Sequence, residues 1–298
     1  MSDYNKKKNK GYSLPIFVSS LVAGVLCVFM FIRSSDSTRL ASVCQSSTTQ
    51  TNQYNEAASD SESNGEVIPH LEIPRLTFDC SQQVIEHAGY TVNYNLSRHI
   101  PNWVAYELTD HEVSGAEERT NKFLPDPMVE GDPVVTKDYS NSGYDRGHMA
   151  PAGDMKWSEQ AMRESFYMTN MCPQNHSNNA GDWKDLEELA RDLAHCYKSL
   201  YICCGPIVTD ESNTIGTVRK IVVPQAFYKV FLRQKPDGSW TSIGFVMPNA
   251  AGNRPLLTYM LSVDEVEQLT GIDFFYNLPD SVEDIIEADY NVSDWTVK

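Results

Sequence analysis

Basic residues are scarce in this sequence. Its 298 residues include 24 lysines and arginines but 40 aspartates and glutamates, which gives a formal net charge of −16. Proteins that attract nucleic acid over a broad surface usually carry a basic footprint, and this composition excludes one for the chain as a whole. Any attraction for a polyanion must therefore come from a local group of cations.

The sequence also lacks internal repeats and the cysteine spacing of a zinc site. Seven cysteines are present, but no two of them form a CxxC pair, which argues against structural zinc. Two lie near the N-terminus, and the body holds the other five: Cys80, Cys172, Cys196, Cys203 and Cys204. Two alternatives stay open for these five, namely one or two disulfides in an exported protein or buried free thiols.

Charge is absent from residues 14–32, which are mostly apolar. A helix of ~20 such residues spans the hydrocarbon core of a bilayer. The lysines at 6, 7, 8 and 10 precede this run, and positive flanks stay on the cytoplasmic side. The run is longer than the ~7–15 residues of a signal-peptide core, and no A-x-A-like site follows closely. We therefore expect an uncleaved membrane anchor with the body on the extracytoplasmic side, periplasmic or extracellular. Cleavage of the segment would instead make the protein secreted.

Composition divides the chain into four segments. Residues 1–13 form a basic cytoplasmic N-terminus, residues 14–32 the transmembrane anchor or signal, and residues 33–67 a linker rich in Ser, Thr, Gln, Asn and Asp. The linker has too little apolar surface to offset the entropy of ordering it, so we expect it to be flexible. The folded domain is predicted to cover residues 68–298.

Strand and helix patterns are intermixed in the body without regular βαβ alternation. Apolar and β-branched runs predict strands at 90–94, 103–108, 165–171, 200–208, 220–232 and 240–247. A Pro-Asp-Gly turn at 236–238 predicts that the last two form a hairpin. Helices are expected at 158–164, 182–198, 263–269 and 282–288, the second with a single apolar stripe. This order favours an α+β fold with a central antiparallel or mixed sheet flanked by helices.

Two clusters of polar residues stand out within the body. The first is Asp145-Arg146-Gly147-His148, which a Met-Ala-Pro sequence follows. The second runs from 169 to 175 as TNMCPQN and continues from 178 to 183 as NNAGDW. We predict that the two clusters meet in space and form one metal-dependent site that cuts phosphodiester bonds.

The residue types in these clusters suit that chemistry. His148 is the natural base, because imidazole titrates near neutral pH, and the planar guanidinium of Arg146 matches phosphate oxygens. Gly147 is expected to let the backbone turn between them. Asn179, at the start of the long helix, offers an amide oxygen to a hard divalent cation. Glu187 is two turns further along, where it could hydrogen-bond water around the metal or orient Asn179.

With both clusters present, the sequence resembles the DNA/RNA non-specific endonucleases, the ββα-metal nucleases that include the endonuclease G type. The resemblance covers roughly residue 82 to the C-terminus and is strongest between 139 and 187. It rests on DRGH at 145–148 and on the later segments 169–174, 179–183 and 186–187, in the same order as in the family. Flanking matches occur at 142–144, 157–158, 161–162 and 166–167.

The resemblance implies a role for each candidate residue and a ββα-metal core. His148 is then the general base, and Asn179 binds Mg²⁺, for which Mn²⁺ is a substitute, with water as most of the remaining ligands. Glu187 supports that water shell. The residues that contact the phosphate or shape the site are Arg146, Asn170 and, upstream, Arg119. The implied substrate is DNA, RNA or both, with little preference for base sequence.

Simpler roles remain open for several of these residues. Arg146 could pair with Asp145, Asn170 could cap a strand end, and Asn179 could be a helix N-cap. Glu187 could form ion pairs with Lys184 or Arg191. Asn175 and Asn178 are the register alternatives to Asn179 as the metal ligand.

Two other functions compete with the nuclease interpretation. One is a membrane-tethered binding module on a nuclease scaffold, and the other is a phosphodiesterase for a smaller, non-nucleic diester, which the acidic surface favours. The sequence also leaves open whether the chain acts as a monomer or as a homodimer.

Overall fold

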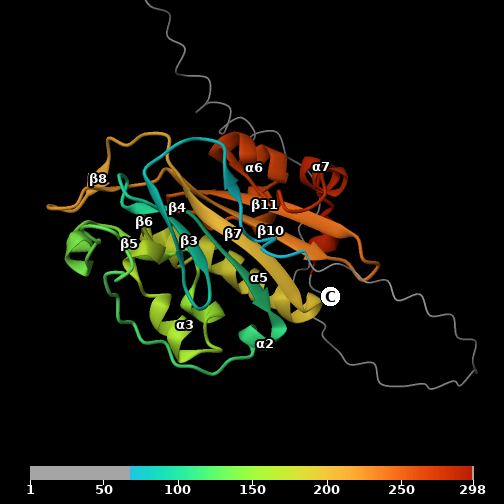
Figure 1. Cartoon of the computed structure of the whole chain (residues 1–298), viewed down its shortest axis with the longest axis horizontal. Helices are drawn as coiled ribbons and strands as arrows, with labels where there is room; N and C mark the ends of the chain where they lie inside the picture. The colour runs from blue at the N-terminus through green and yellow to red at the C-terminus, as the bar shows by residue number, and fades with distance from the viewer. Residues whose placement is uncertain (1–67, 297–298) are drawn as a thin grey trace, which may run out of the picture. The chain divides into compact units, whose positions relative to one another are not determined.

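The computed structural model describes residues 68–296 (Figure 1). The predicted anchor at 14–32 and the predicted linker at 33–67 lie outside these residues, so both stay predictions, as do the segment boundaries. Between residues 68 and 296, no helix has the length and apolar character needed to cross a membrane.

One seven-stranded antiparallel sheet forms the centre of the fold. Its strands, in spatial order, are β12 (Met260–Leu261), β11 (Trp240–Pro248), β10 (Ala226–Gln234), β7 (Ser199–Ile207), β4 (Ile100–Thr109), β3 (Thr91–Asn95) and β2 (Gln82–Glu86). The predicted hairpin is present, since Gln234 pairs with Trp240 across the 236–238 turn. The predicted α+β fold with a central antiparallel sheet is therefore confirmed.

Helices and shorter strands surround this sheet. The α-helices are α2 (Asp110–Val113), α3 (Glu159–Glu164), α4 (His176–Asn179), α5 (Asp182–Tyr197), α6 (Val263–Thr270) and α7 (Asp280–Ala288). The two-stranded pairings are β1 (Arg75–Leu76) with β13 (Ile272–Asp273), β5 (Asp145–His148) with β6 (Met171–Gln174), and β8 (Thr214–Ile215) with β9 (Ile221–Val222). The 3₁₀ turns are η1 (Thr136–Tyr139), η2 (Ala152–Asp154), η3 (Met168–Asn170), η4 (Leu256–Tyr259) and η5 (Val292–Trp295).

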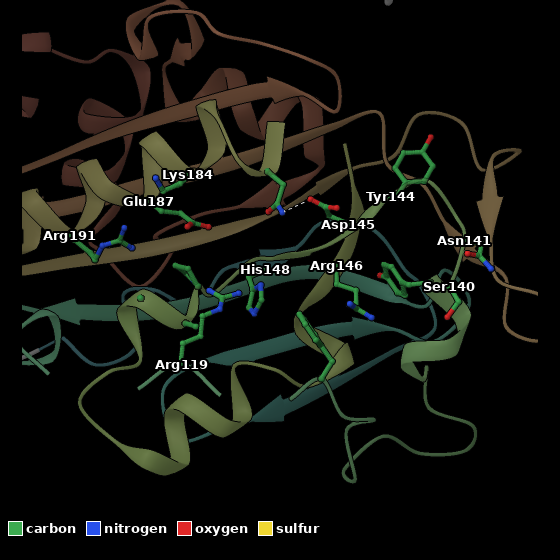
Figure 2. Close-up of a pocket in the computed structure, with 16 residues that line it drawn as sticks. Arg119, Ser140, Asn141, Tyr144, Asp145, Arg146, His148, Lys184, Glu187 and Arg191 are labelled. Atoms are coloured by element: carbon green, nitrogen blue, oxygen red, sulfur yellow. Dashed lines mark hydrogen bonds between the residues drawn. The ribbon is translucent and has the colours of Figure 1, made fainter. Parts of the chain in front are cut away.

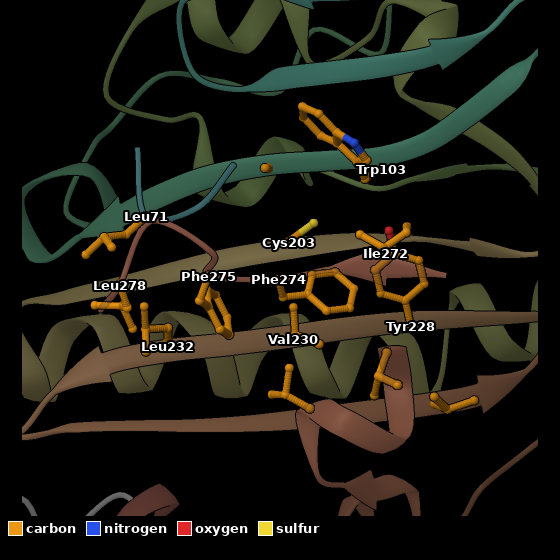
Figure 3. Close-up of a cluster of buried hydrophobic side chains, with 14 of the residues drawn as sticks. Leu71, Trp103, Cys203, Tyr228, Val230, Leu232, Ile272, Phe274, Phe275 and Leu278 are labelled. Atoms are coloured by element: carbon orange, nitrogen blue, oxygen red, sulfur yellow. The ribbon is translucent and has the colours of Figure 1, made fainter. Parts of the chain in front are cut away.

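The two faces of the sheet carry different helices. Successive side chains of a strand point to opposite faces, so β10 shows which helix covers which face. Its Phe227 meets the ring of Trp183 from α5, with 5.6 Å between ring centroids. Its neighbour Tyr228 belongs instead to the apolar cluster that includes Val263 of α6 and Phe274 (Figure 3). Helix α5 therefore covers one face of the sheet, and α6 packs on the other.

Two of the predicted strands are wrong in detail. Residues 165–171 form mainly a 3₁₀ turn, because the amide of Asn170 donates to the carbonyl of Tyr167 (3.0 Å), and a strand begins only at Met171. The predicted strand 220–232 is interrupted at Pro224, which has no N–H to donate to a ladder, so β9 and β10 are separate.

For three of the five body cysteines, the structure decides between a disulfide and a buried free thiol. Cys172, Cys203 and Cys204 are buried free thiols, and burial raises the pKa of the Cys204 thiol to about 11. They act as small apolar side chains in the core.

Candidate active site

The two polar clusters form one β-hairpin-like pair followed by helices. Strand β5, which is the DRGH segment, pairs antiparallel with β6, so that Gly147 faces Cys172 and His148 faces Met171. The chain then enters α4 and α5 directly. The prediction that the clusters meet in space is confirmed at the level of the backbone, although the sequence did not indicate that DRGH itself is a strand.

Position 147 requires glycine because a side chain would clash there, and not because the backbone turns. It lies within β5, and its φ is not among the positive values of the chain. A Cβ atom at this position would lie 2.0 Å from Oε1 of Gln174 and 2.7 Å from its Cβ. Any side chain would therefore push the two strands apart, which corrects the expectation of a backbone turn at Gly147.

A cleft of about 740 Å³ opens beside β5 and α5 (Figure 2). Its charged lining residues are the cations Arg119, Arg146, Lys184 and Arg191 and the carboxylates Asp145 and Glu187. His148, Asn179 and Phe123 also line it. Cations outnumber carboxylates here, in contrast to the acidic chain as a whole, so the cleft is the local cationic group that the composition demanded.

His148 sits in an apolar and cationic environment. Its ring packs edge-on against Phe166 (5.0 Å between centroids) and lies 5.6 Å from the ring of Phe123. Its Nε2 atom is buried and has no hydrogen-bond partner between residues 68 and 296. Burial, followed by the positive charges of Arg119 and Arg146, lowers the pKa of His148 to about 3. The imidazole is therefore neutral at pH 7.

The backbone around His148 is held from two sides. The indole Nε1 of Trp183, on α5, donates to the His148 carbonyl (3.2 Å). The side-chain amide of Asn170 accepts a hydrogen bond from the N–H of Ala150 (2.9 Å) and donates one to the carbonyl of Ala150 (2.8 Å). It also donates to the carbonyl of Ser165 (2.8 Å). Trp183 and Asn170 thus fix the direction in which β5 presents His148.

The position of Asn170 disagrees with the expected contact to substrate. The residue is fully buried and does not line the cleft. Its three side-chain hydrogen bonds all go to backbone groups, which leaves nothing to offer a phosphate. The alternative raised from the sequence, a backbone cap, describes its geometry.

Two arginines hold their guanidinium groups over phenyl rings. The guanidinium carbon of Arg146 lies 4.2 Å from the ring centroid of Phe123, and that of Arg119 lies 5.1 Å from the centroid of Phe166. Arg119 also donates from Nε to the side chain of Asn121 (2.7 Å). Within residues 68–296, Arg146 has no ion pair with Asp145 or with any other acid. The ring stacking orients both guanidinium groups and leaves most of their N–H groups available to a ligand in the cleft.

Asn179 is oriented by Asp145, a role that the sequence did not reveal. Oδ2 of Asp145 accepts from Nδ2 of Asn179 (2.9 Å) and from Nδ1 of His176 (2.8 Å). A carboxylate only accepts hydrogen bonds, so the amide nitrogen of Asn179 must face it. The amide oxygen is then left to face other groups in the cleft, and an oxygen of this kind suits a hard divalent cation.

The register of the second cluster also favours Asn179. Asn175 caps α4 by accepting from the amide of Ser177 (3.0 Å). Asn178 is buried and accepts from Nε2 of Gln174 (2.6 Å). Neither residue lines the cleft, whereas Asn179 does.

The helix assignment around Asn179 is a correction. Asn179 is the last residue of α4, and α5 starts at Asp182 with Gly181 as its N-cap. Asn179 is therefore neither an N-cap nor on the same helix as Glu187. The two residues reach one cleft because the short break at 180–181 redirects the chain.

Glu187 lies half-buried on the cleft side of α5. Burial raises its pKa to about 7, although the positive charge of Lys229 opposes this rise. The ion pairs considered from the sequence go elsewhere: Arg191 donates to Asp154 (2.9 Å), and Lys184 pairs with Glu188 (3.1 Å). Glu187 thus keeps its carboxyl group available in the cleft.

Sequence reasoning missed several residues of this site. Helical spacing placed Lys184 and Arg191 on the face of Glu187, but only as its ion-pair partners and not as residues that line the cleft. Lys229 gave no signal, because it lies in a largely apolar strand and belongs to no motif. It is fully buried, its Nζ has no hydrogen-bond partner in the described part of the chain, and Nζ lies 4.6 Å from the ring centroid of Trp183.

Known proteins share this architecture. The family profile of the DNA/RNA non-specific endonucleases matches residues 70–281. The mitochondrial nuclease EXOG of Danio rerio is 37% identical over 204 residues, which are 63% of this chain and 60% of that protein. A nuclease of Nostoc sp. is 35% identical over 214 residues, 67% of this chain and 75% of that protein. The crystal structure of the EndoG/EndoGI complex contains a chain that matches with a TM-score of 0.62 at 30% identity, covering 67% of this chain and 88% of that one.

The antiparallel sheet with its flanking helices defines an α+β protein with an EndoG-like fold. The chain belongs to the DNA/RNA non-specific endonuclease family, and the resemblance carried by the two polar clusters is confirmed. The chain spans 56 to 60% of the length of the mitochondrial EXOG proteins that it matches.

Proposed function

We propose that this chain is a divalent-metal-dependent endonuclease that hydrolyses phosphodiester bonds of DNA, RNA or both without strong sequence preference. One observation carries the proposal: a neutral histidine, two stacked arginines and an amide oxygen oriented by Asp145 converge in one cationic cleft. Family membership supports the same class of activity. Few local cations are enough because an enzyme holds only the phosphates around the bond that it cuts.

In the proposed mechanism Arg146 and Arg119 bind oxygens of the scissile phosphate through their planar donors. The imidazole of His148, neutral because of its lowered pKa, takes a proton from the attacking water. Asn179 would hold a divalent cation, Mg²⁺ or Mn²⁺, which when bound supplies positive charge for the leaving oxygen. The carboxyl group of Glu187, when ionised, accepts hydrogen bonds from water beside Asn179 and keeps it ordered.

A plasmid-nicking assay on the full-length chain tests the activity directly. We expect nicking with Mg²⁺ or Mn²⁺ and none with EDTA, and cleavage of single-stranded RNA under the same conditions. Turnover of a small diester without nicking would favour a non-nucleic phosphodiesterase instead. Binding of DNA without any cleavage would favour a binding module.

Base preference tests the contacts that we propose. Arginines bound to phosphate position a nucleic acid but do not read its sequence. We expect cleavage sites mapped along an end-labelled duplex to be spread over many sequences. A single sharp recognition sequence would contradict the proposed mode of binding.

We also propose that residues 14–32 anchor the enzyme in a membrane with the folded domain on the extracytoplasmic side. The apolar run and the lysines before it support this orientation. The full-length chain should stay in the membrane fraction after a high-salt wash, and protease added outside intact cells should remove its folded domain. Release by salt would contradict an anchor, and recovery of a shortened chain from the medium would indicate cleavage.

A further inference from the structure

One C-terminal stretch of the chain is strongly acidic. Residues 262–296 contain ten aspartates and glutamates and no lysine, arginine or histidine. Helices α6 and α7 belong to this stretch and lie side by side (Figure 1). Because α6 and α7 pack on the sheet face opposite to α5, their acids lie on the other side of the sheet from Glu187.

Three carboxylates from these two helices converge on one point. One oxygen each of Asp264, Glu267 and Glu287 lies within 4.8 Å of the other two. Glu287 is only 4% exposed, and its Oε1 atom is buried without a hydrogen-bond partner between residues 68 and 296. A buried carboxylate oxygen without a partner is costly, and either a bound cation or a shared proton would offset that cost.

The charges around the cluster do not provide that group. Of the ion pairs between described residues, none includes Asp264, Glu267 or Glu287. The neighbouring acids Asp273 and Glu283 add further negative charge. Arg75 is the cation on β1, and its Nε already donates to Asp273 (3.0 Å).

We propose that Asp264, Glu267 and Glu287 form a second cation site, specific for Ca²⁺, that fastens α7 to α6. Carboxylate oxygens are the ligands that this ion takes, at about 2.3–2.6 Å, so two of them on opposite sides of one ion are about 5 Å apart. The three oxygens lie within 4.8 Å of one another, so one ion can contact all three. Mg²⁺ keeps several waters and is usually bound by only one or two carboxylates.

The elements that carry the three ligands are fixed independently of any ion. Asp264 and Glu267 are three residues apart on one face of α6, a helix that starts with a capping box at Ser262 and ends at Gly271 in the left-handed conformation. The chain next to Glu287 is held because the hydroxyl of Ser242 on β11 donates to the carbonyl of Ile286 (2.6 Å). The ligands therefore face one another on rigid supports, as a cation site requires.

This site differs from the one proposed at Asn179 in charge and in position. Asn179 offers a neutral amide oxygen in the cleft, whereas the α6–α7 site offers three carboxylates on the opposite face of the sheet. The second site is therefore expected to keep its ion when the first is disabled, and its presence does not depend on whether the chain cuts nucleic acid.

Calcium binding to the full-length, EDTA-stripped chain tests the proposal. We expect isothermal titration with CaCl₂, in buffer containing Mg²⁺, to give one Ca²⁺ per chain in the wild type and in Asn179→Ala. Glu287→Gln should weaken this binding at least ~10-fold, since Ca²⁺ affinity follows the charge of the ligands. Asp284→Asn, which removes the same charge from the exposed side of α7, is the matched control and should bind like the wild type.

Thermal unfolding provides a readout that does not depend on calorimetry. Because Ca²⁺ would bind only the folded state, saturating Ca²⁺ should raise the melting temperature of the wild type and of Asp284→Asn. The rise should vanish in Glu287→Gln, and Glu267→Gln serves if that variant does not fold. Equal Ca²⁺ binding by Glu287→Gln and Asp284→Asn, or no binding at all, would overturn the proposal. Stability that is independent of Ca²⁺ and falls as the pH rises would instead identify a cluster held by a shared proton.

Discussion

At the scale of single residues, the site works by freeing side-chain groups from competing partners. His148 lies among phenyl rings and guanidinium groups, so it is neutral and has a nitrogen without a partner. Asp145 holds the amide nitrogen of Asn179 and thereby frees its oxygen. In both cases a neighbour that does no chemistry decides what the functional atom can do.

Replacing His148 tests its role as the base. His148→Ala should lower the rate of nicking by about 10²–10⁴-fold, the usual contribution of a general base, while circular dichroism and the melting temperature show a folded domain. His195→Ala, at an exposed histidine on α5, should cut at the wild-type rate. A His148→Ala variant that cuts nearly as fast as the wild type would remove this residue from the mechanism.

Replacing Asp145 tests the orientation of Asn179. Without the carboxylate, the amide can rotate and its oxygen is no longer directed, so Asp145→Ala should raise the Mg²⁺ concentration for half-maximal activity by about 10–100-fold. Asn179→Ala should weaken the Mg²⁺ dependence further. Asn175→Ala is the control: it removes an N-cap worth about 1 kcal/mol of stability and should leave the Mg²⁺ titration unchanged. A shift in that variant alone would move the ligand to Asn175.

At the scale of elements, α5 and β10 together support the cleft. Trp183 of α5 donates to the carbonyl of His148 and covers Lys229 of β10. The positive charge of Lys229 lowers the pKa of Glu187, which burial otherwise raises. A cation buried beneath the helix therefore favours the ionised form of the Glu187 carboxyl group.

Removing this cation should shift the pH dependence of cutting. The pKa of Glu187 is about 7, so the ionised fraction falls as the pH drops below 7. In Lys229→Met the pKa of Glu187 rises, and activity should be lost at a higher pH than in the wild type. The measurement is a pH–rate profile at subsaturating Mg²⁺. Lys184→Met, at an exposed lysine, should change the profile less, and a profile that moves to lower pH in Lys229→Met would contradict the assignment.

The sequence predicted most elements because they depend on local patterns. The apolar stripe of 182–198 gave α5 nearly to the residue, and the Pro-Asp-Gly turn gave the β10–β11 hairpin. The two polar clusters also located the cleft. What failed depends on contacts between residues distant in sequence. The side chain of Asn170 is hydrogen-bonded to backbone groups up to twenty residues away in the sequence. The hydrogen bond between Asp145 and Asn179 joins residues thirty-four positions apart.

At the scale of the whole molecule, the lining of the cleft and the helices α6 and α7 carry net charge of opposite sign. The cleft side carries Arg119, Arg146, Lys184 and Arg191, and the opposite side carries the acids of α6 and α7. The net charge of −16 therefore does not describe what a substrate meets at the cleft. The composition excluded a broad basic surface, and none is needed.

This division predicts a weak dependence of cutting on salt. Each phosphate that a cation contacts on duplex DNA contributes about −0.9 to the slope of log affinity against log salt, and few cations are available here. Arg119→Ala should reduce the magnitude of that slope for kcat/KM by about 1. Arg75→Ala, which removes an arginine paired on the α6 and α7 side, should leave the slope unchanged. Equal effects of the two variants would show that the cleft has no special electrostatic role.

The molecule therefore presents local charges of opposite sign on the two faces of its sheet, a net positive cleft lining on one and the acids of α6 and α7 on the other. A polyanion that diffuses toward it exerts a torque, because its field attracts one face and repels the other. The molecule is thereby turned cleft-first before contact, and collisions in the wrong orientation become fewer. The acidic helices, which never touch the substrate, can in this way raise the fraction of encounters that lead to binding.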